Sequence, residues 1–599
     1  MCTLKKIVII VLFFILKTAI GQETGLVAKI HSHNDYKQKV PFWTAYACGL
    51  NSIEVDVFLK NDTLFVTHSE NELTPYNTIE NLYLKPLQKT LEINPQLNQE
   101  IQILLDIKSE AISTLRSIIN VLESYPNLIN SENISFVISG NQPKTEAYIN
   151  YPFYIKFDYQ SLKPISEESL NKVGLISLPF SKFSNWNGKG RLTMEDYKMV
   201  KEIIDKAHSF NKPFRFWGCP DSKTAWKVFT ELEVDFINTD MPFEASKYIF
   251  SLPSRISKNS FFSEVYKPTY HSDKKNTKVE NIILMIGDGY GLSQISAATL
   301  SNQGKLTLTQ LKSIGFLKTQ SADDFTTDSA AAGTAIATGE KTYNRSIGMG
   351  VNRLPIENLT ELLNKHNYNT GFITTDNVTG ATPSAFYAHQ LDRDMETEII
   401  NDLSKSKLSL FIGSGSDNFL KTFNDSNFTI TNNLNDISLT ESNKVGFFFS
   451  EKGVPSINSG RGDILSEATK VSMAYLSNKK KPFFLLVEGA QIDSFGHVND
   501  ISGIISEAID FDKAITEAIK YADAHENTLV IITADHETSG LSIPQGNLKD
   551  NVVEGDFSTY DHTGIMVPIF AYGPKSDLFS GVYENNEVFH KIKEVLNIK

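Results

Sequence analysis

The sequence predicts two α/β domains in series, a (β/α)8 barrel of the TIM type followed by a doubly wound α/β sandwich. The chain has 599 residues, which is too many for a single hydrophobic core. Short apolar, β-branched segments alternate with helical patterns in the first half, and buried strands that end in acids or histidines alternate with helices in the second. We therefore expect domains at residues 25–250 and 279–599.

Residues 1–21 are predicted to be a signal peptide. Lys5 and Lys6 precede an apolar run over residues 7–16, and residues 19–21 form a small-x-small cleavage signal before Gln22. An uncleaved membrane anchor is the alternative, although the apolar run is short for a membrane span. The prediction is a secreted or periplasmic protein with no membrane attachment after cleavage.

The mature chain is acidic and poor in cysteine. Its formal charge of -13 becomes -16 once the three lysines of the signal peptide are removed. Such a charge disfavours binding of nucleic acid through the general surface, so a bound phosphate needs local cations. Only Cys48 and Cys219 remain after cleavage, which excludes a disulfide framework and cysteine-rich metal sites and leaves their pairing open.

Eight short apolar segments predict the strands of the barrel. They recur at the spacing of a repeated strand–helix unit. The segments are residues 28–33, 51–59, 101–108, 134–140, 153–158, 174–181, 214–220 and 235–240. Because active sites of such barrels lie at the carboxyl ends of the strands, polar residues at those ends are candidates for function.

Histidines, acids and a lysine stand at the ends of the first predicted strands. They are His31, His33, Glu54, Asp56, His68, Asp106 and Lys108. Two carboxylates two residues apart, with a third from a neighbouring strand, can hold a hard divalent cation such as calcium or magnesium. Two histidines can exchange protons with a leaving and an attacking oxygen.

This half resembles the glycerophosphodiester phosphodiesterase and phosphatidylinositol phospholipase C-like barrels. The matching stretches, within residues 28–242, are HSHNDY, GLNSIEVDVFLKNDTLFVTHS, LLDIKS and VDFINTDMP. The resemblance implies that His31 and His68 form the acid/base pair. It also implies a calcium or magnesium site whose ligands are Glu54, Asp56 and Asp106.

Two positions depart from the commoner pattern of those barrels. Residues 31–33 read His-Ser-His where His-Arg-Gly is commoner, and Asp106 stands where a glutamate is usual. A non-catalytic barrel that binds a phosphodiester or a glycan, and so tethers the second domain, is therefore the alternative.

Residues 251–278 are predicted to be a linker. The stretch is rich in Ser, Lys and Pro and follows neither hydrophobic period. Its aromatic side chains, Phe261, Phe262, Tyr266 and Tyr270, indicate that it packs on a domain.

Three predicted strands of the second half lead into acids and histidines. Residues 281–291 read NIILMIGDGYG, 483–493 read FFLLVEGAQID and 528–537 read TLVIITADHE. The carboxyl ends of strands in an open α/β sheet meet at one ligand-binding edge. The candidate ligands are Asp288, Glu488, Asp493, His497, Asp535, His536 and His562. Carboxylate with imidazole suits zinc, and the oxygen pair of Asp288 and Glu488 suits magnesium.

Residues 325–345, FTTDSAAAGTAIATGEKTYNR, predict a closely packed helix whose first turn holds Asp328 and Ser329. Free backbone N–H groups and the positive end of the helix dipole meet there. A serine in that place can hold a phosphate oxygen or attack phosphorus. A serine that only caps the helix is the structural alternative.

The second half closely resembles the alkaline phosphatases. The matches, in the family's order, are NIILMIGDGYG, TTDSAAAGTAIATGEKT, ATPSAFYAH, VEGAQIDSFGH, TADHETSG and DHTG. The resemblance implies that Ser329 becomes phosphorylated and that Arg393 clamps the phosphate oxygens. The implied metal ligands are Asp493, His497 and His562 for one zinc, Asp288, Asp535 and His536 for a second zinc, and Asp288, Thr382 and Glu488 for one magnesium. Gly380 stands where family members often carry an acid or histidine beside the third metal.

The sequence as a whole predicts a secreted, metal-dependent phosphomonoesterase behind a phosphodiesterase barrel. Its expected substrates are small phosphate monoesters and glycerophosphodiesters, so that one chain releases inorganic phosphate from a diester in two steps. A preference of the second domain for diesters or sulfates is the alternative within the same superfamily. A homodimer is left open.

Overall fold

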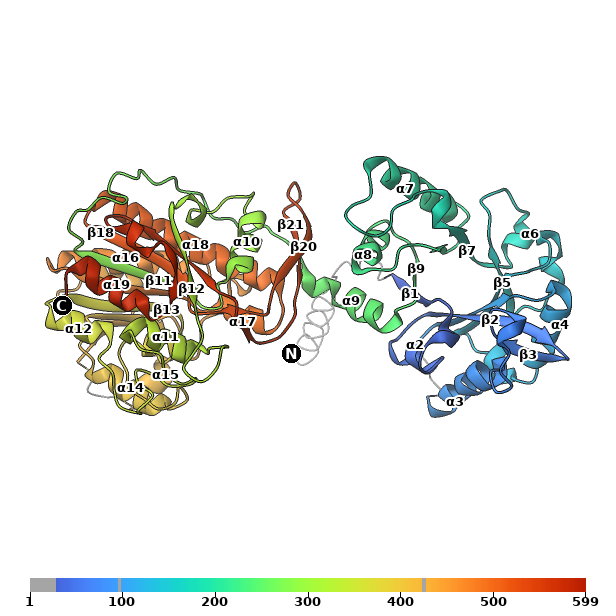
Figure 1. Cartoon of the computed structure of the whole chain (residues 1–599), viewed down its shortest axis with the longest axis horizontal. Coiled ribbons are helices and arrows are strands. Elements are labelled where there is room, and N and C mark those ends of the chain that lie inside the picture. The colour runs from blue at the N-terminus through green and yellow to red at the C-terminus, as the bar shows by residue number, and fades with distance from the viewer. Residues whose placement is uncertain (1–27, 95–98, 423–426) are drawn as a thin grey trace, which may run out of the picture. The chain divides into compact units, whose positions relative to one another are not determined.

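The computed structural model describes residues 28–94, 99–422 and 427–599, and the predicted signal peptide at residues 1–21 lies outside them. The chain forms two compact units, the first ending at Leu252 and the second beginning at Pro253. Figure 1 shows both, coloured along the chain. Among the described residues, no helix is both long enough and apolar enough to cross a membrane.

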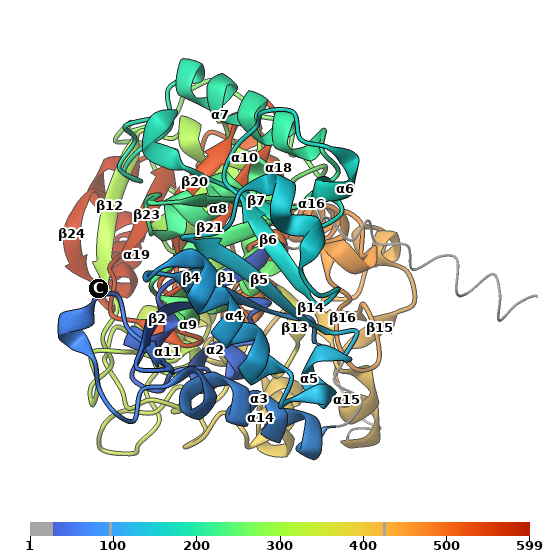
Figure 2. The same ribbon diagram turned by 90° about the vertical axis from the view of Figure 1, so that its right-hand side faces the viewer.

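The first unit is a closed barrel of eight parallel strands (Figures 1 and 2). β1 pairs with both β9 and β2, which closes the sheet. The strands are β1 (Lys29–Ser32), β2 (Ser52–Lys60), β4 (Ile101–Ile107), β5 (Ile134–Gly140), β6 (Ile155–Tyr159), β7 (Val173–Pro179), β8 (Phe214–Trp217) and β9 (Phe236–Thr239). β3 (Thr63–Val66) is antiparallel to β2. The predicted barrel is confirmed, and each of the eight predicted segments overlaps one of its strands.

Apolar side chains from separate strands meet inside the barrel. Leu104, Val137, Leu175 and Phe236 form one buried cluster, although β5, β7 and β9 are not neighbours in the sheet. Contact between non-adjacent strands requires that these side chains point into the interior, as layered packing of such barrels demands. The helices of this unit are α2 (Trp43–Ala47), α3 (Lys85–Ile93), α4 (Ala111–Leu122), α5 (Pro126–Ile129), α6 (Glu167–Leu170), α7 (Met194–His208), α8 (Lys223–Glu231) and α9 (Pro242–Arg255).

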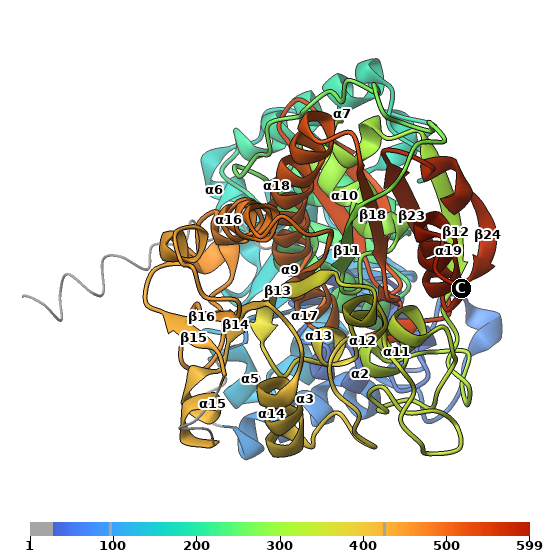
Figure 3. The same ribbon diagram turned by 90° about the vertical axis from the view of Figure 1, so that its left-hand side faces the viewer.

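The second unit is built on a ten-stranded mixed sheet (Figure 3). In spatial order its strands are β15 (Thr429–Thr431), β16 (Val445–Phe448), β14 (Leu410–Ser414), β13 (Asn369–Asn377), β17 (Phe483–Gly489), β11 (Asn281–Gly287), β18 (Thr528–Ala534), β23 (Val567–Tyr572), β12 (Ser313–Lys318) and β24 (Gly581–Glu584). β23 runs antiparallel to both of its neighbours. Every residue of β11, β17 and β18 is buried, which explains their continuous apolar sequence.

Helices cover this sheet in two groups. α10 (Leu292–Ser301), α16 (Ile464–Asn478) and α18 (Ile501–Ala524) pack together, and α16 and α18 contact the central strands. α12 (Leu359–Lys365), α13 (Ala381–Ser384) and α19 (Glu587–Leu596) pack around α11 (Ser329–Thr338). α14 (Glu396–Lys405), α15 (Ser416–Thr422) and α17 (Gln491–His497) complete the unit, with small sheets of β10 (Ile256–Lys258), β21 (Val552–Asp556) and β20 (Ser542–Asn547), and of β19 (Glu537–Thr538) and β22 (His562–Thr563). The predicted doubly wound α/β sandwich is confirmed.

The segment predicted as a linker packs on the second unit. β10 pairs antiparallel with β21, and Phe261, Tyr266 and Tyr270 lie against the apolar core of this unit. The ammonium group of Lys513 lies 3.8 Å from the centre of the Phe261 ring. The chain after α9 is therefore part of the second unit.

A buried ion cluster fastens the loop between β16 and α16 to α18. The guanidinium of Arg461 lies 2.5 Å from the Glu507 carboxylate and 2.7 Å from that of Asp510, and all three side chains are almost fully buried. Arg461 also donates to the backbone carbonyl of Pro455, and Ile457 N donates to Glu507. One cation thus compensates two buried acids and holds the loop.

We expect Arg461→Met to destabilise the second unit by about 3–5 kcal/mol, because two buried carboxylates lose their cation. Denaturant unfolding of the full chain, followed by far-UV circular dichroism, measures the change. All four tryptophans, Trp43, Trp186, Trp217 and Trp226, lie in the first unit, so tryptophan fluorescence is the internal control. Addition of Glu507→Gln and Asp510→Asn restores most of the loss. A loss of unfolding free energy below about 1 kcal/mol would contradict this expectation, because exposed ion pairs contribute only that much.

Candidate functional site

Acids from three parallel strands meet at one edge of the second sheet. Gly287 of β11 is in register with Gly489 of β17 and Ala534 of β18. Asp288 and Asp535 directly follow this level of the sheet, and Glu488 directly precedes it. Asp288, Asp535 and His536 each offer a ligand atom, and all three atoms lie within 4.8 Å of one another. His536 Nε2 lies 3.3 Å from a carboxylate oxygen of each acid. This group can hold one divalent cation.

A second group lies on α17 and β22. Asp493 and His497 are one helical turn apart, and their side chains approach to 3.2 Å. The Nε2 atoms of His497 and His562 are also 3.2 Å apart. The Nδ1 atoms of these histidines face the carbonyls of Tyr560 and Thr327 at 2.7 and 2.8 Å. Because a carbonyl only accepts, Nδ1 carries a proton, and Nε2 is the ring nitrogen that can bind a metal once it is deprotonated.

A third group consists of oxygen atoms. Thr382 is buried beside Glu488, and its hydroxyl has no well-formed hydrogen bond among the described residues. One carboxylate oxygen each of Asp288 and Asp535 is buried and accepts no hydrogen bond in the described structure, although each lies 3.3 Å from His536 Nε2. Orphaned buried oxygens are costly unless a cation or water satisfies them, so the donor set fits magnesium.

Burial and mutual repulsion change the acid–base behaviour of this centre. Burial raises the pKa of Glu488 to about 8 and that of Asp535 to about 6. The hydrogen bond with Asp493 raises the pKa of His497 to about 9, whereas burial lowers that of His536 to about 3. Without cations the cluster therefore holds protons at neutral pH.

Ser329 is the first residue of α11 and faces this centre. Its Oγ lies 3.3 Å from His536 Nε2, and the residue is almost fully buried. The cap of the helix is Asp328, whose Oδ1 accepts from Ala331 N at 2.9 Å. The alternative of a capping serine is therefore wrong, because Asp328 caps the helix. The hydroxyl of Ser329 instead faces His536, one of the predicted metal ligands.

Arg393 approaches the same place through Asp328. Its Nη1 lies 3.2 Å from Asp328 Oδ2. A cavity of about 490 Å³ is lined by Asp288, Ser329, Arg393 and Asp493, together with Asp376, Phe495 and others. The predicted nucleophile Ser329, the predicted phosphate-binding Arg393 and ligands of the first and second groups thus line one cavity.

Arg345 is a further residue of this site, and no sequence pattern predicted it. Its guanidinium donates to both carboxylate oxygens of Asp392 at 2.8 Å and to Asp394 at 2.5 Å, the two residues that flank Arg393. Arg345 N donates to Asp328 Oδ1, and Arg345 O accepts from Arg393 N. The contacts join segments 17 residues or more apart, so no local pattern indicated them.

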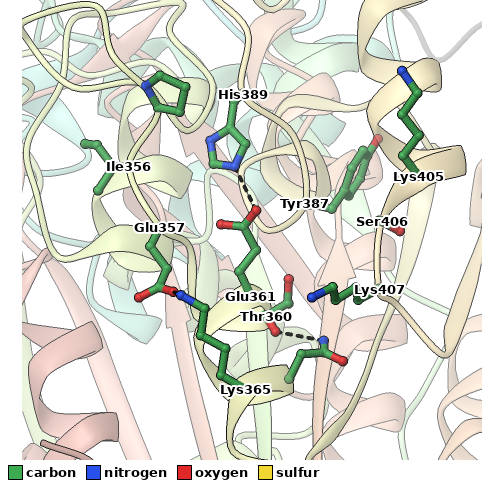
Figure 4. A pocket seen from close by; sticks show the side chains of 12 residues that line it. Ile356, Glu357, Thr360, Glu361, Lys365, Tyr387, His389, Lys405, Ser406 and Lys407 are labelled. Atoms are coloured by element: carbon green, nitrogen blue, oxygen red, sulfur yellow. Dashed lines mark hydrogen bonds and ion pairs between the residues drawn. The ribbon is translucent and has the colours of Figure 1, made fainter.

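A second cavity of about 490 Å³ lies away from this chemistry (Figure 4). Its walls come from α12, the end of α14 and the segment that carries His389. Both of its acids have partners, Lys365 for Glu357 and His389 for Glu361. None of the predicted site residues lines this cavity.

The barrel has its own cavity of about 290 Å³, at the strand ends. Among its lining residues are His33, Glu54, His68, Asp106, Lys108 and Arg215. Asp56 holds His68 Nδ1 at 2.8 Å, which leaves the other ring nitrogen free of this contact. Against the opposing effect of burial, the hydrogen bond with Asp240 raises the pKa of His33. The structure therefore places two histidines at the mouth of the barrel.

His31, expected as one of the proton-transfer residues, does not line that cavity. It is fully buried, with Nδ1 2.7 Å from Ser52 Oγ and Nε2 2.8 Å from Glu54 Oε2. Burial, with Arg215 nearby, lowers its pKa to about 3. Both ring nitrogens are occupied inside the barrel, so we correct the expectation and assign the cavity position to His33.

The predicted cation ligands of the barrel lie together. Atoms of Glu54, Asp56 and Asp106 lie within 4.8 Å of one another. Lys108 Nζ stands 3.3 Å from Asp56 and 3.2 Å from Asp106, and Arg215 Nη1 stands 2.6 Å from Glu54. One oxygen each of Asp56 and Asp106 remains buried without a hydrogen bond in the described residues, which fits an oxygen-ligated cation.

We expect the metal-free protein to release two or more protons at pH 7 when it is loaded with zinc and magnesium, because Glu488 and His497 must lose theirs to become ligands and burial also raises the pKa of Asp288. The pKa values of Glu488 and His497 both lie above 7, so the release declines as the pH rises through 8 and 9. Calorimetric titrations in buffers of different ionisation enthalpy count the protons. A heat of binding independent of the buffer at pH 7 contradicts the assigned protonation states.

Comparisons with known proteins find relatives for both units. The alkaline phosphatase family profile matches residues 279–411, 448–550 and 550–598. In the first unit, the AIM6-like phosphodiesterase domain matches residues 23–110, and the glycerophosphoryl diester phosphodiesterase family matches residues 213–242. The matches cover the predicted ligands and nucleophile of the second unit and the acidic strand ends of the barrel.

Individual relatives cover the second unit. Alkaline phosphatase 4 of Bacillus subtilis is 29% identical over 427 residues, which is 56% of this chain and 93% of that protein. The alkaline phosphatase of the Antarctic bacterium TAB5 has 40% identity and a TM-score of 0.52, over 54% of this chain and all of that one. A variant of the TAB5 enzyme, 38% identical with a TM-score of 0.51 over 54% of this chain and 99% of its own, has magnesium bound in its M3 site. The chain belongs to the alkaline phosphatase family through its second unit and carries an AIM6-like, glycerophosphodiesterase-like barrel domain in front of it.

Proposed function

We propose that this alkaline phosphatase is a secreted zinc- and magnesium-dependent enzyme that forms a phosphoseryl intermediate on Ser329, and that its barrel supplies monoesters by opening glycerophosphodiesters. The main support is the place of Ser329. Its hydroxyl stands at the amino end of α11, 3.3 Å from His536 and in one cavity with Arg393 and Asp493.

The chain's own groups position the phosphate. A phosphate monoester carries about two negative charges near neutral pH, which an acidic protein must offset locally. Arg393 binds two phosphate oxygens through its planar fork, and Asp328 holds that fork through a 3.2 Å contact. The free N–H groups at the start of α11 add donors on the same side. Ser329 Oγ is thereby aimed at phosphorus.

Three cation sites surround the serine. The assigned ligands are Asp493, His497 and His562 for one zinc, Asp288, Asp535 and His536 for the other, and Asp288, Thr382 and Glu488 for magnesium. When bound, these ions supply the positive charge that lowers the pKa of the attacking hydroxyl and stabilises the leaving oxygen. Ser329 Oγ bonds to phosphorus as the ester oxygen leaves, and water then frees inorganic phosphate and the serine.

In the barrel we assign proton transfer to His33 and His68, which line its cavity. Calcium or magnesium held by Glu54, Asp56 and Asp106 would polarise a phosphodiester. Lys108 and Arg215 line the same cavity and add positive charge for the phosphate. A barrel that binds but does not cleave remains the second candidate, because Lys108 and Arg215 already contact these acids.

Export rests on the signal peptide predicted at residues 1–21. A basic start, a short apolar run and a small-x-small site support a secreted or periplasmic location. Phosphate release outside the cytoplasm is consistent with a chain that joins two phosphoester-cleaving folds.

We expect Ser329→Ala to lower kcat for 4-nitrophenyl phosphate by about a thousandfold or more, because the attacking oxygen is removed. Cleavage of glycerophosphocholine by the barrel survives in the same protein. Release of 4-nitrophenol measures the first activity, and release of choline or phosphocholine measures the second. Loss of both together would show that the activities are not divided between the units.

The Ser329→Ala chain is also the background for testing the barrel. Addition of His33→Ala abolishes glycerophosphodiester cleavage if the barrel is catalytic. Absence of turnover before that change, with calcium or magnesium present, favours the tethering role. Sulfate release from 4-nitrophenyl sulfate by the unmutated protein in excess of phosphate release would contradict the monoesterase assignment.

We expect Arg345→Asn to raise the inhibition constant of inorganic phosphate about fivefold, since Arg393 loses the clamp on its flanking aspartates. Asparagine tolerates the left-handed backbone of Arg345, whose φ is 73°. Arg353→Asn is the matched control, because Arg353 is an exposed arginine with φ of 61°. Arg345→Lys retains part of the effect. Equal changes at positions 345 and 353 would contradict the positioning role.

A further inference from the structure

One acidic side chain of the phosphatase cavity has no part in the assigned ligand sets. Asp376, near the end of β13, is exposed to the cavity that Asp288, Ser329 and Arg393 line. Its carboxylate acts electrostatically on Glu488 and is itself influenced by Arg393. An unassigned negative charge therefore stands beside the magnesium ligands.

Hydrogen bonds at the end of β13 hold the segment that carries Asp376 beside β17. Thr374 is in register with Glu488 and donates a hydrogen bond to its carboxylate. Asp376 lies two residues further on, within the irregular end of β13, and its side chain lines the cavity that Asp288 and Arg393 also line. Asp376 N also donates to Thr374 Oγ1 at 2.9 Å, which fixes this turn of the chain. The neighbouring Thr375 accepts from Ala490 N, just after β17.

Asp376 occupies the space in which a side chain at position 380 would lie. A Cβ atom on Gly380 would stand 2.6 Å from Asp376 Oδ2, closer than van der Waals contact allows. The φ of Gly380 is -52°, so its backbone does not require glycine. Gly380 immediately precedes α13, which carries Thr382. The absence of a side chain at 380 and the carboxylate of 376 are therefore complementary.

The assigned magnesium ligands carry little negative charge of their own, so a further carboxylate near them is favourable. Thr382 is neutral, and Asp288 is shared with the second zinc set, so Glu488 is the only carboxylate that serves this cation alone. Magnesium keeps several water molecules when it binds to proteins, and those molecules need acceptors. The Thr382 hydroxyl, which makes no well-formed hydrogen bond among the described residues, is a separate sign that this place takes a ligand.

On the basis of the proposed function, we infer that Asp376 is a positioning residue of the magnesium site, where its carboxylate accepts hydrogen bonds from cation-bound water and takes the place of a side chain at 380. It acts on magnesium affinity, and it is not a ligand of either zinc. The same geometry predicts that the carboxylate can be supplied from position 380 once the side chain at 376 is shortened.

The test is calorimetric titration of magnesium into the full-length, zinc-loaded protein. We expect Asp376→Asn to raise the magnesium Kd by about tenfold or more and to leave zinc content unchanged, as for the loss of an outer-shell partner. The magnesium-dependent rise in Tm falls in parallel. Asp577→Asn, at an exposed position, is the matched control and leaves the Kd unchanged.

A transplant of the carboxylate tests the geometry. Asp376→Ala weakens magnesium binding, and the double variant Asp376→Ala/Gly380→Asp recovers it to within about threefold, because the new side chain enters the vacated space. Gly380→Asp alone does not tighten binding, since its Cβ meets the Asp376 carboxylate. Failure of the double variant to recover affinity, while its zinc content is normal, overturns the inference.

Two further results separate this inference from the proposed function. The titration needs no turnover and can be repeated in the Ser329→Ala protein. Unchanged magnesium affinity in Asp376→Asn, with a changed inhibition constant for phosphate, shows that Asp376 serves Arg393 and overturns the inference alone. No magnesium binding by the unmutated, zinc-loaded protein overturns the proposed cation set as well.

Discussion

The register of parallel strands brings like charges together at one edge of the second sheet, and the phosphatase site depends on this constraint. β11 is in register with β17 and β18, so Asp288 and Asp535 leave the sheet at the same level, and Glu488 lies two residues before that level on β17. Buried carboxylates this close raise one another's pKa and oppose folding unless protons or cations neutralise them. This edge of the sheet is therefore locally destabilised unless protons or cations are bound there.

The nucleophile and the phosphate clamp are coupled through one carboxylate. Asp328 caps α11 with Oδ1 and contacts Arg393 with Oδ2, while Arg345 N donates to Oδ1 as well. The helix is almost entirely small residues, and all of its ten residues are buried. Such close packing holds the amino end of α11, and with it Ser329, against the metal ligands.

The barrel applies the same strand-end principle with different compensation. Its three acids already contact Lys108 and Arg215, whereas the ion pairs of Asp288, Asp493 and Asp535 among the described residues are with histidines. A cation entering the barrel must therefore share its ligands with fixed positive charges.

The sequence by itself determined both fold classes, the strand ends that carry acids, and the pairing of Asp493 with His497. These features depend on local periodicity, on residues adjacent to a strand end, or on one helical turn. Only the tertiary structure decided which histidine enters the barrel cavity. His31 and His33 are two residues apart, as are successive side chains on one face of a strand. However, β1 ends at Ser32, so His33 lies outside the strand. Arg215, which is 184 residues away in the chain, contacts His31. The roles of Arg345 and Asp376 were likewise outside the reach of the sequence, because they depend on side chains that the fold brings to Arg393 and into the space at Gly380.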